Sequence, residues 1–380
     1  MKRLTDICDI QYGYAFDSKC FTEDSSYPQL VRIRDVKRGY SETYYSGDYP
    51  EEYILSEGDL LVGMDGEFNI ARWKCSGALL NQRVCKLTAK VGTNEEYIRL
   101  AMLKSLKEIE QRTAFVTVKH LSAKELNKLE LDIPELTKQD KIADTLSRLE
   151  RVIEARKEEL EKLDELIKAR FVELFGDLAN PKCQWKKEKL VDACKNPDDI
   201  KCGPFGTQLS KDEYCSSGVA VWEIPQINSG FATQPTHFLT DEKANQLEAY
   251  SIKSGDIAMS RKGNVGRCAV FPETMEDGII HSDVLRIRID NDLVLPVFMM
   301  HQLHYSGAVQ HQIELVSSGA IMAGINVTKL KQIEVHIPPL ELQNQFADFV
   351  KHVDKSKVAV QKVLDETQKL FDSLMQQYFG

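Results

Sequence analysis

The sequence lacks a long hydrophobic run, which argues against a helical membrane protein. No stretch approaches the roughly 18 uninterrupted apolar residues of a membrane-spanning helix. The 380-residue chain is 42% hydrophobic and 28% charged, as is usual for a globular protein. Asp6 and Asp9 interrupt the N-terminal stretch that would have to be apolar in a signal peptide. We therefore expect a cytoplasmic protein.

Cysteine is present, but not with the spacing of a metal site or a disulfide framework. The nine cysteines include no C-x-x-C pair and no Cys/His array at zinc spacing, and their number is odd. Reduced thiols are therefore expected. Four histidines lie in an amphipathic helical stretch or at the start of a strand, where packing or surface roles are more typical than metal binding: His281, His301, His304 and His311.

Motifs of catalysis are also missing. The chain has no G-x-x-x-x-G-K-S/T phosphate loop, no G-x-G-x-x-G turn after a strand, and no Asp or Asn followed by Pro-Pro-Tyr or Pro-Pro-Phe, the motif of adenine methyltransferases. Gly203-Pro-Phe-Gly-Thr207 lacks the lysine that a phosphate loop needs. We therefore expect a noncatalytic protein that binds no metal or cofactor of its own.

The sequence also lacks an excess of positive charge. The net charge of −9 argues against nonspecific coating of nucleic acid, because the phosphate backbone would repel the chain. Much of the acidity falls within residues 150–177, so a local basic cleft elsewhere is still compatible with the composition.

The strongest positive feature is an internal duplication. Residues 126–176 and 330–380 align without a gap at a fixed offset of 204 residues. Identical pairs include Leu126/Leu330, Pro134/Pro338, Gln139/Gln343, Leu166/Leu370 and Gly176/Gly380. One structural unit is therefore used twice, which indicates a partner or substrate that is met twice.

Each copy contains a long amphipathic helix. Apolar residues recur at steps of three, four or seven over 137–174, and again over 341–378. About 40 residues at 1.5 Å each predict a helix on the order of 55–60 Å. The two apolar seams are expected to cover each other as an antiparallel coiled coil. A short strand and a proline precede each helix, at 129–134 and 333–338.

The remaining residues form two globules with short β-like runs and helical patches, so we predict an α+β fold. Within the globules, Gly58-Asp59 and Gly255-Asp256 occupy equivalent places, as do Asn81 and His281. The predicted order is a globule at 1–135, a helical spacer at 136–180, a globule at 181–338 and a helical spacer at 339–380. The helices agree closely while the globules have diverged, as expected if the helices meet identical partners and the globules meet different targets.

The whole chain resembles the specificity (S) subunits of type I restriction-modification enzymes. The residues that carry the resemblance are Gly203-Pro-Phe-Gly-Thr-Gln-Leu-Ser-Lys211, Gly255-Asp-Ile-Ala-Met-Ser-Arg-Lys-Gly263-Asn-Val-Gly-Arg267 and Ile337-Pro-Pro-Leu-Glu-Leu-Gln343. The first globule departs from this pattern, with Gln11-Tyr-Gly-Tyr-Ala-Phe16 in place of the first stretch and a single proline at 134.

The resemblance implies a DNA reader with a pseudo-twofold internal repeat. Each globule would be a target-recognition domain that binds one half of a split double-stranded DNA sequence in the major groove. The helices would fix the distance between the domains and carry two copies of an adenine methyltransferase subunit, which uses S-adenosylmethionine. A restriction subunit, where one is present, would use ATP and magnesium.

Base reading calls for Arg or Lys at guanine and Asn or Gln at adenine, with cations at phosphates. In the first globule the candidates are Arg32, Arg34, Lys37, Arg38, Arg72, Lys74, Asn81, Gln82 and Arg83, and Arg32 and Arg34 are expected to share one strand face. In the second they are Gln208, Ser210, Lys211, Gln226, Asn228, Arg261, Lys262, Asn264 and Arg267. Gly263 and Gly266 permit a tight loop there. The alternative role for these residues is a solvated strand edge or turn, and Trp73 and Trp222 are expected to pack in or near the core rather than to stack on bases.

A second function stays open at this point. A coiled-coil adaptor whose two globules bind proteins would explain the helices and the acidity without DNA. In an adaptor the polar candidates of the two globules would scatter, whereas in a DNA reader they would line one continuous groove.

Overall fold

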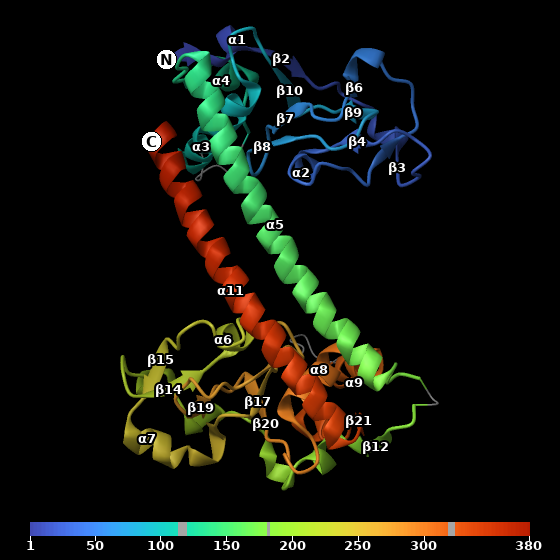
Figure 1. Ribbon diagram of the computed structural model, residues 1–380, viewed down its shortest axis with the longest axis vertical. Coiled ribbons are helices and arrows are strands. Elements are labelled where there is room, and N and C mark those ends of the chain that lie inside the picture. Colours follow the sequence, from blue (N-terminus) through green and yellow to red (C-terminus); the bar gives the residue numbers. More distant parts are fainter. Residues whose placement is uncertain (113–119, 181–182, 318–323) are drawn as a thin grey trace. The chain divides into compact units, whose positions relative to one another are not determined.

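The chain forms two compact units, which the computed structural model describes for residues 1–112, 120–180, 183–317 and 324–380. Unit 1 comprises Met1–Lys157 with Lys362–Gly380, and unit 2 comprises Glu158–Gln361. Two 40-residue helices, α5 (Leu136–Phe175) and α11 (Leu340–Phe379), each contribute to both units (Figure 1). The predicted division into four segments stays a prediction, and its boundary at 181 lies outside the described residues.

Unit 1 contains a four-stranded antiparallel sheet in the order β2 (Cys8–Tyr12), β10 (Val84–Ala89), β7 (Leu60–Gly63) and β8 (Asn69–Arg72). In a second sheet, β9 (Ala78–Leu80) lies between the parallel β4 (Leu30–Val31) and the antiparallel β6 (Ile54–Leu55). Two further pairs join β1 (Lys2–Arg3) to β11 (Glu130–Leu131) and β3 (Phe21–Thr22) to β5 (Tyr44–Tyr45). The helices of the globule are α1 (Leu4–Ile7), α2 (Ile33–Val36), α3 (Glu95–Arg112) and α4 (Ala123–Lys128).

Unit 2 repeats this topology. Its antiparallel sheet runs β13 (Ile200–Cys202), β20 (Val284–Ile287), β17 (Ile257–Ser260) and β18 (Cys268–Val270). Its second sheet places β19 (Gly278–Ile280) between the parallel β14 (Val219–Trp222) and the antiparallel β16 (Ser251–Ile252), with β15 (His237–Leu239) added beside β14. β12 (Lys186–Lys189) pairs with β21 (Glu334–Ile337). The helices are α6 (Ile224–Asn228), α7 (Asp241–Gln246), α8 (Pro296–Tyr305), α9 (Gly307–Ser317) and α10 (Val327–Leu330).

Strand register makes the repeat exact enough to match positions one by one. Gly63 pairs with Val84 in unit 1, and Ser260 pairs with Val284 in unit 2. Gly13 and Gly203 also correspond: a Cβ added at either would lie about 2 Å from the carbonyl oxygen of Asn81 or His281, respectively. Only glycine fits there, so the divergent Gln11-Tyr-Gly stretch takes the structural place of the start of Gly203-Pro-Phe-Gly. The equivalence of Asn81 and His281 is confirmed.

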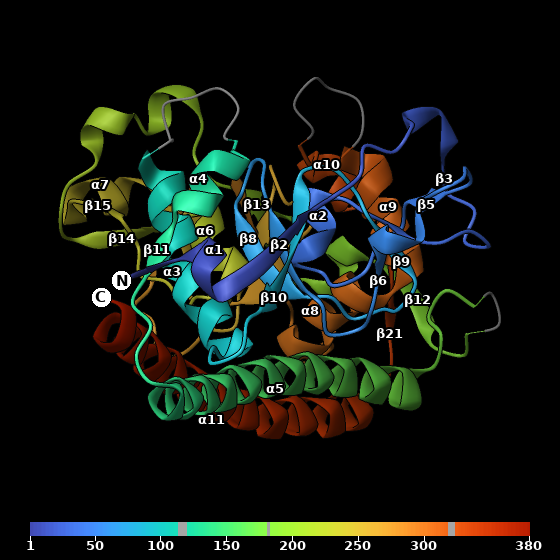
Figure 2. The same ribbon diagram turned by 90° about the horizontal axis from the view of Figure 1, so that it is seen from above.

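The two long helices pack against the globules and against each other, as the apolar seams predicted. In unit 2 the ring centroids of Phe171 and Phe346 lie 5.4 Å apart, and Lys357 Nζ lies 2.6 Å from Asp164 Oδ1. Residue numbers rise along α5 as they fall along α11, so the pairing is antiparallel (Figure 2). In unit 1, Ile142 and Leu146 of α5 enter the core on which the last turns of α11 pack.

The identical glutamines of the duplication fasten each long helix to its globule. Gln139 is buried, donates from Nε2 to the Pro134 carbonyl at 2.7 Å and accepts the Asn94 N–H at 2.9 Å. Gln343 repeats this with the Pro338 carbonyl at 2.7 Å and the Leu295 N–H at 2.8 Å. These bonds satisfy backbone groups at the helix entrance that burial would otherwise leave without partners.

Further details of the fold concern the tryptophans, the helices after residue 295 and the cysteines. Trp73 and Trp222 are 1% and 2% exposed, so both pack in cores as predicted. One of the helical patches expected in the second globule consists of two helices, α8 and α9, separated at Ser306. The nine cysteines are free thiols. Within residues 1–112, 120–180, 183–317 and 324–380, no helix is long and apolar enough to cross a membrane, and no group of His, Cys, Asp or Glu is arranged to hold a metal ion.

Candidate nucleic-acid interface

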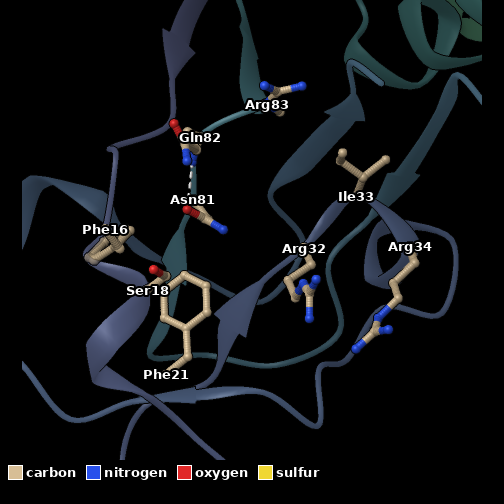
Figure 3. A pocket seen from close by; sticks show the side chains of 9 residues that line it. All are labelled: Phe16, Ser18, Phe21, Arg32, Ile33, Arg34, Asn81, Gln82 and Arg83. Carbon is tan, nitrogen blue, oxygen red and sulfur yellow. Dashed lines mark hydrogen bonds between the residues drawn. The ribbon is translucent and has the colours of Figure 1, made fainter. Parts of the chain in front are cut away.

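Five of the predicted residues in unit 1 line one open cavity of about 430 Å³. Arg32 and Arg34 come from the start of α2, and Asn81, Gln82 and Arg83 come from the turn before β10. Figure 3 shows Phe16, Ser18 and Phe21 on one side and Arg32 and Arg34 on the other, with Asn81 near the middle and Gln82 and Arg83 above. Amide and guanidinium groups beside aromatic rings are chemically suited to base edges and phosphates.

One prediction about this cluster is wrong: Arg32 and Arg34 do not share a strand face. β4 ends at Val31, Arg32 caps α2, and Arg34 lies within that helix. The reason is the buried Asp35, whose carboxylate accepts the Arg32 N–H at 3.0 Å and the Ser41 hydroxyl at 2.9 Å. This local bond favours a helical turn over a longer strand. The turn still places both arginines on the cavity wall.

Arg83 is held in an unusual backbone conformation. Its φ of +70° lies in the left-handed region, and its guanidinium pairs with Asp65, which also contacts His120. Burial works to raise the pKa of Asp65, but its hydrogen bonds to His120 and Arg83 and their charges outweigh burial and hold that pKa below its ordinary value. Beside it, Asn81 is 8% exposed and accepts the Gln82 N–H at 2.9 Å, so it is largely committed within the turn.

The remaining unit 1 candidates divide into exposed cations and one structural residue. Lys37 and Arg38 are exposed next to Arg34, and Lys74 is exposed with its aliphatic stem over Gly39. Arg72 instead donates to Glu95 at 2.8 Å and to Glu96 at 2.9 Å. Its guanidinium thereby ties β8 to α3, which favours a structural role over DNA contact.

In unit 2 the best predicted cluster is the hairpin between β17 and β18. Arg261 donates from Nε to the Ile325 carbonyl at 3.1 Å and stacks its guanidinium 4.8 Å from the centroid of the exposed Phe205 ring. Lys262 Nζ lies 2.8 Å from Asp283 Oδ1. Gly263 and Gly266 have φ of +67° and +82°, so the predicted tight loop is confirmed.

Asn264 and Arg267 are exposed and line a groove of about 840 Å³ between the hairpin, α8, α5 and α11. Arg261 and Lys262 are not among the residues that line this groove. The structure therefore divides the predicted hairpin residues into two pairs.

The other unit 2 candidates lie in or beside short helical turns. Gln208 accepts the Phe205 N–H at 3.1 Å, the backbone of Ser210 donates to Glu213, and Lys211 is exposed. Asn228 is exposed at the end of α6. Gln226 is 2% exposed, accepts the Glu223 N–H and donates to the Gln234 carbonyl, an arrangement that favours a structural role.

Sequence reasoning missed three side chains at these clusters: Asp65, Asp283 and Phe205. A pattern of cations and amides, the groups suited to bases and phosphates, does not single out the carboxylates that pair with them. Phe205 lay within the stretch Gly203-Pro-Phe-Gly, and its exposure of 47% is the signal that only the structure supplies.

Comparison with known proteins agrees over almost the whole chain. The family model for the type I restriction modification DNA specificity domain matches residues 1–165 and 185–367. The type I restriction enzyme EcoBI specificity subunit of Escherichia coli is 27% identical, covering 99% of this chain and 84% of that protein. The MjaVIII specificity subunit of Methanocaldococcus jannaschii is 22% identical over 86% of this chain and 79% of its own. The crystal structure of a type I S subunit from M. genitalium covers 100% of this chain and 95% of its own, with a TM-score of 0.63 at 15% identity.

Proposed function

The chain belongs to the family of type I restriction-modification DNA specificity subunits, noncatalytic components that recognise DNA, and from this premise we propose how its two units divide the work. Unit 1 and unit 2 each bind one half of a split double-stranded DNA target. The long helices α5 and α11 seat two copies of an adenine methyltransferase subunit. The protein works in the cytoplasm, and each copy of the methyltransferase acts on one half of the target.

The observation that carries this proposal is the contrast between topology and surface. Both units have the same strand order and register, so they can approach a duplex in the same manner. The side chains on the equivalent turns differ, with Arg32 and Arg83 in unit 1 where unit 2 has Glu223 and Asp283. Two units of the same fold whose surface side chains differ are suited to two half-sites of different DNA sequence.

Two partner copies are supported by an exposed apolar pair on the long helices. Leu166 and Leu370, identical members of the duplication, are 47% and 50% exposed. They occupy equivalent helix positions in different units. An apolar side chain that is left in water at the same place in each repeat is suited to two identical partner surfaces.

Cofactors belong to the partners in this scheme. The methyltransferase subunits bind S-adenosylmethionine, and a restriction subunit, where one is present, uses ATP and magnesium. This chain contributes DNA contacts and spacing alone. The rival role as a protein-binding adaptor is less favoured, because Arg32, Arg34 and Arg83 converge on one cavity in unit 1 rather than scatter.

The test is light scattering of the chain co-expressed with an adenine methyltransferase subunit of the type I class. We expect two methyltransferase copies per chain, one copy with either Leu166→Glu or Leu370→Glu, and none with both substitutions. Lys168→Glu, an exposed position two residues from Leu166 and on a different helix face, is the matched control and should keep both copies. A single methyltransferase copy on the unaltered chain, or single variants that retain two copies, would refute this arrangement.

A further inference from the structure

Three segments meet at one place in each unit. In unit 1 they are α2 with its flanking residues (32–38), the turn 81–83 and the hairpin 64–67; in unit 2 they are residues 223–229, 281–283 and 261–265. We name this the three-segment surface. Equivalent bonds join it, since the Met64 N–H donates to the Arg83 carbonyl and the Arg261 N–H donates to the Asp283 carbonyl, both at 2.8 Å.

An ion pair lies at the same position in both units with its polarity reversed. In unit 1 the hairpin carries the anion, Asp65, and the turn carries the cation, Arg83. In unit 2 the hairpin carries the cation, Lys262, and the turn carries the anion, Asp283. The pair fastens the hairpin to the turn in each case, so its structural purpose is kept while the charge presented by each segment is exchanged.

The helices of the three-segment surface, α2 in unit 1 and α6 in unit 2, also carry different charges. The Arg32 N–H donates to Asp35 and the Glu223 N–H donates to Gln226, which fixes Arg32 and Glu223 as equivalent cap residues. Counting on from the caps, unit 1 has Arg34, Lys37 and Arg38 where unit 2 has Pro225, Asn228 and Ser229.

These cations are available to a ligand in unit 1. The Arg34 side chain is 63% exposed, and the Lys37 side chain is 73% exposed with Glu67 no nearer than 3.9 Å. In unit 2, by contrast, the cap residue Glu223 is a carboxylate paired with His237 at 2.7 Å. The cations of that surface are Arg261 and Lys262, both in the hairpin.

Phosphates attract cations and repel carboxylates, so exchanged charges imply exchanged contacts. We propose that the two units bind DNA through different segments of their equivalent three-segment surfaces. Unit 1 contacts phosphates through residues 32–38, which contain α2, and unit 2 contacts them through the hairpin 261–265. The proposal rests on the proposed function and refines it. Unit 1, with cations at four positions where unit 2 has Glu223, Pro225, Asn228 and Ser229, also carries the larger share of the salt-dependent affinity.

The test measures the affinity of the complex with methyltransferase for a fluorescently labelled duplex as salt is raised. Arg32→Gln and Arg34→Gln in unit 1, and Lys262→Gln in unit 2, should each weaken binding several-fold and lower the slope of log affinity against log salt by about 0.9, one phosphate contact. Glu223→Gln, at the position equivalent to Arg32, keeps an acceptor for His237 and should leave the slope unchanged.

The outcomes separate this inference from the proposed function. A lower slope for Glu223→Gln, or an unchanged slope for the Arg32 and Arg34 variants in a complex that still binds DNA, overturns the inference and leaves the function standing. A complex with the unaltered chain that shows no salt-dependent binding of duplex DNA overturns both. Arg32 and Arg34 are exposed, so their variants are expected to fold, which circular dichroism checks.

Discussion

Replacing Gln343 with leucine should destabilise unit 2 by several kcal/mol. Leucine is close in size to glutamine and an apolar side chain normally suits a buried site, but leucine cannot replace the hydrogen bonds of Gln343. The glutamine side chain is fully buried, donates to the Pro338 carbonyl at 2.7 Å and accepts the Leu295 N–H at 2.8 Å. Leucine removes both bonds, together with a longer one from Nε2 to the Leu293 carbonyl at 3.3 Å, and the Pro338 carbonyl and the Leu295 N–H lose this partner at about 1–3 kcal/mol each. Offset by about 1 kcal/mol of added apolar burial, the expected loss is on the order of 3 kcal/mol.

Urea unfolding of the full chain, followed by hydrogen exchange of peptides from unit 2, measures this loss. With a urea dependence of roughly 2–3 kcal/mol per molar, the midpoint of unit 2 should fall by about 1 M. Gln345→Leu makes the same substitution at an exposed position two residues further along α11 and should shift the midpoint little. Equal shifts for Gln343→Leu and Gln345→Leu would show that the buried hydrogen bonds are not what fastens the helix.

Three other predictions follow from buried charges and thiols. Arg99→Met should destabilise unit 1 by roughly 1–3 kcal/mol in urea unfolding, because the Arg99 side chain is 12% exposed and its loss removes the cation beside Glu150 and one of the two arginines beside Glu96, which keeps Arg72. An unchanged midpoint would contradict this. His301 should cost unit 2 on the order of 3 kcal/mol as pH falls from about 6.5 to about 4, because burial lowers the pKa of His301 to about 4 and the unfolded chain therefore takes up the proton first. Burial also lowers the pKa of His304 to about 4, so His304 should add to the loss over the same range. His301→Gln should weaken that pH dependence in urea midpoints measured across this range, and a variant with the full dependence would refute the assignment. Cys85 and Cys268 should resist iodoacetamide in the native protein and react in urea, because burial raises the pKa of each thiol to about 12. The partly exposed Cys20 should react in the native protein. Mass spectrometry of the alkylated peptides measures the reaction of each thiol.

The parts of the fold that the sequence could predict are those governed by local periodicity and by the repeat. Apolar residues at helical spacing predicted α5 and α11, and a proline before each marked where they begin. The identical pair Gln139 and Gln343 marked a shared structural need, which the structure shows to be the helix entrance. These features depend on neighbours in the chain, so a single sequence contains them.

Features that depend on tertiary partners could not be predicted. Arg32 and Arg34 fit a strand pattern, but the bond from Arg32 to Asp35 and the packing of Asp35 beneath it favour a helical turn. Arg72 has the residue type of a DNA contact, yet its ion pairs with α3 appear only once β8 and α3 are packed. The exchanged polarity of the Asp65–Arg83 and Lys262–Asp283 pairs likewise requires the strand register.

The most direct measurement of the central claim is methylation mapping of genomic DNA after incubation with S-adenosylmethionine and the methyltransferase subunit, with and without this chain. We expect a single split motif, with a methylated adenine in each half, that appears only when the chain is present. A motif that is unchanged in the absence of the chain, or methylation of one continuous site, would contradict the claim that its two units each recognise half of the target.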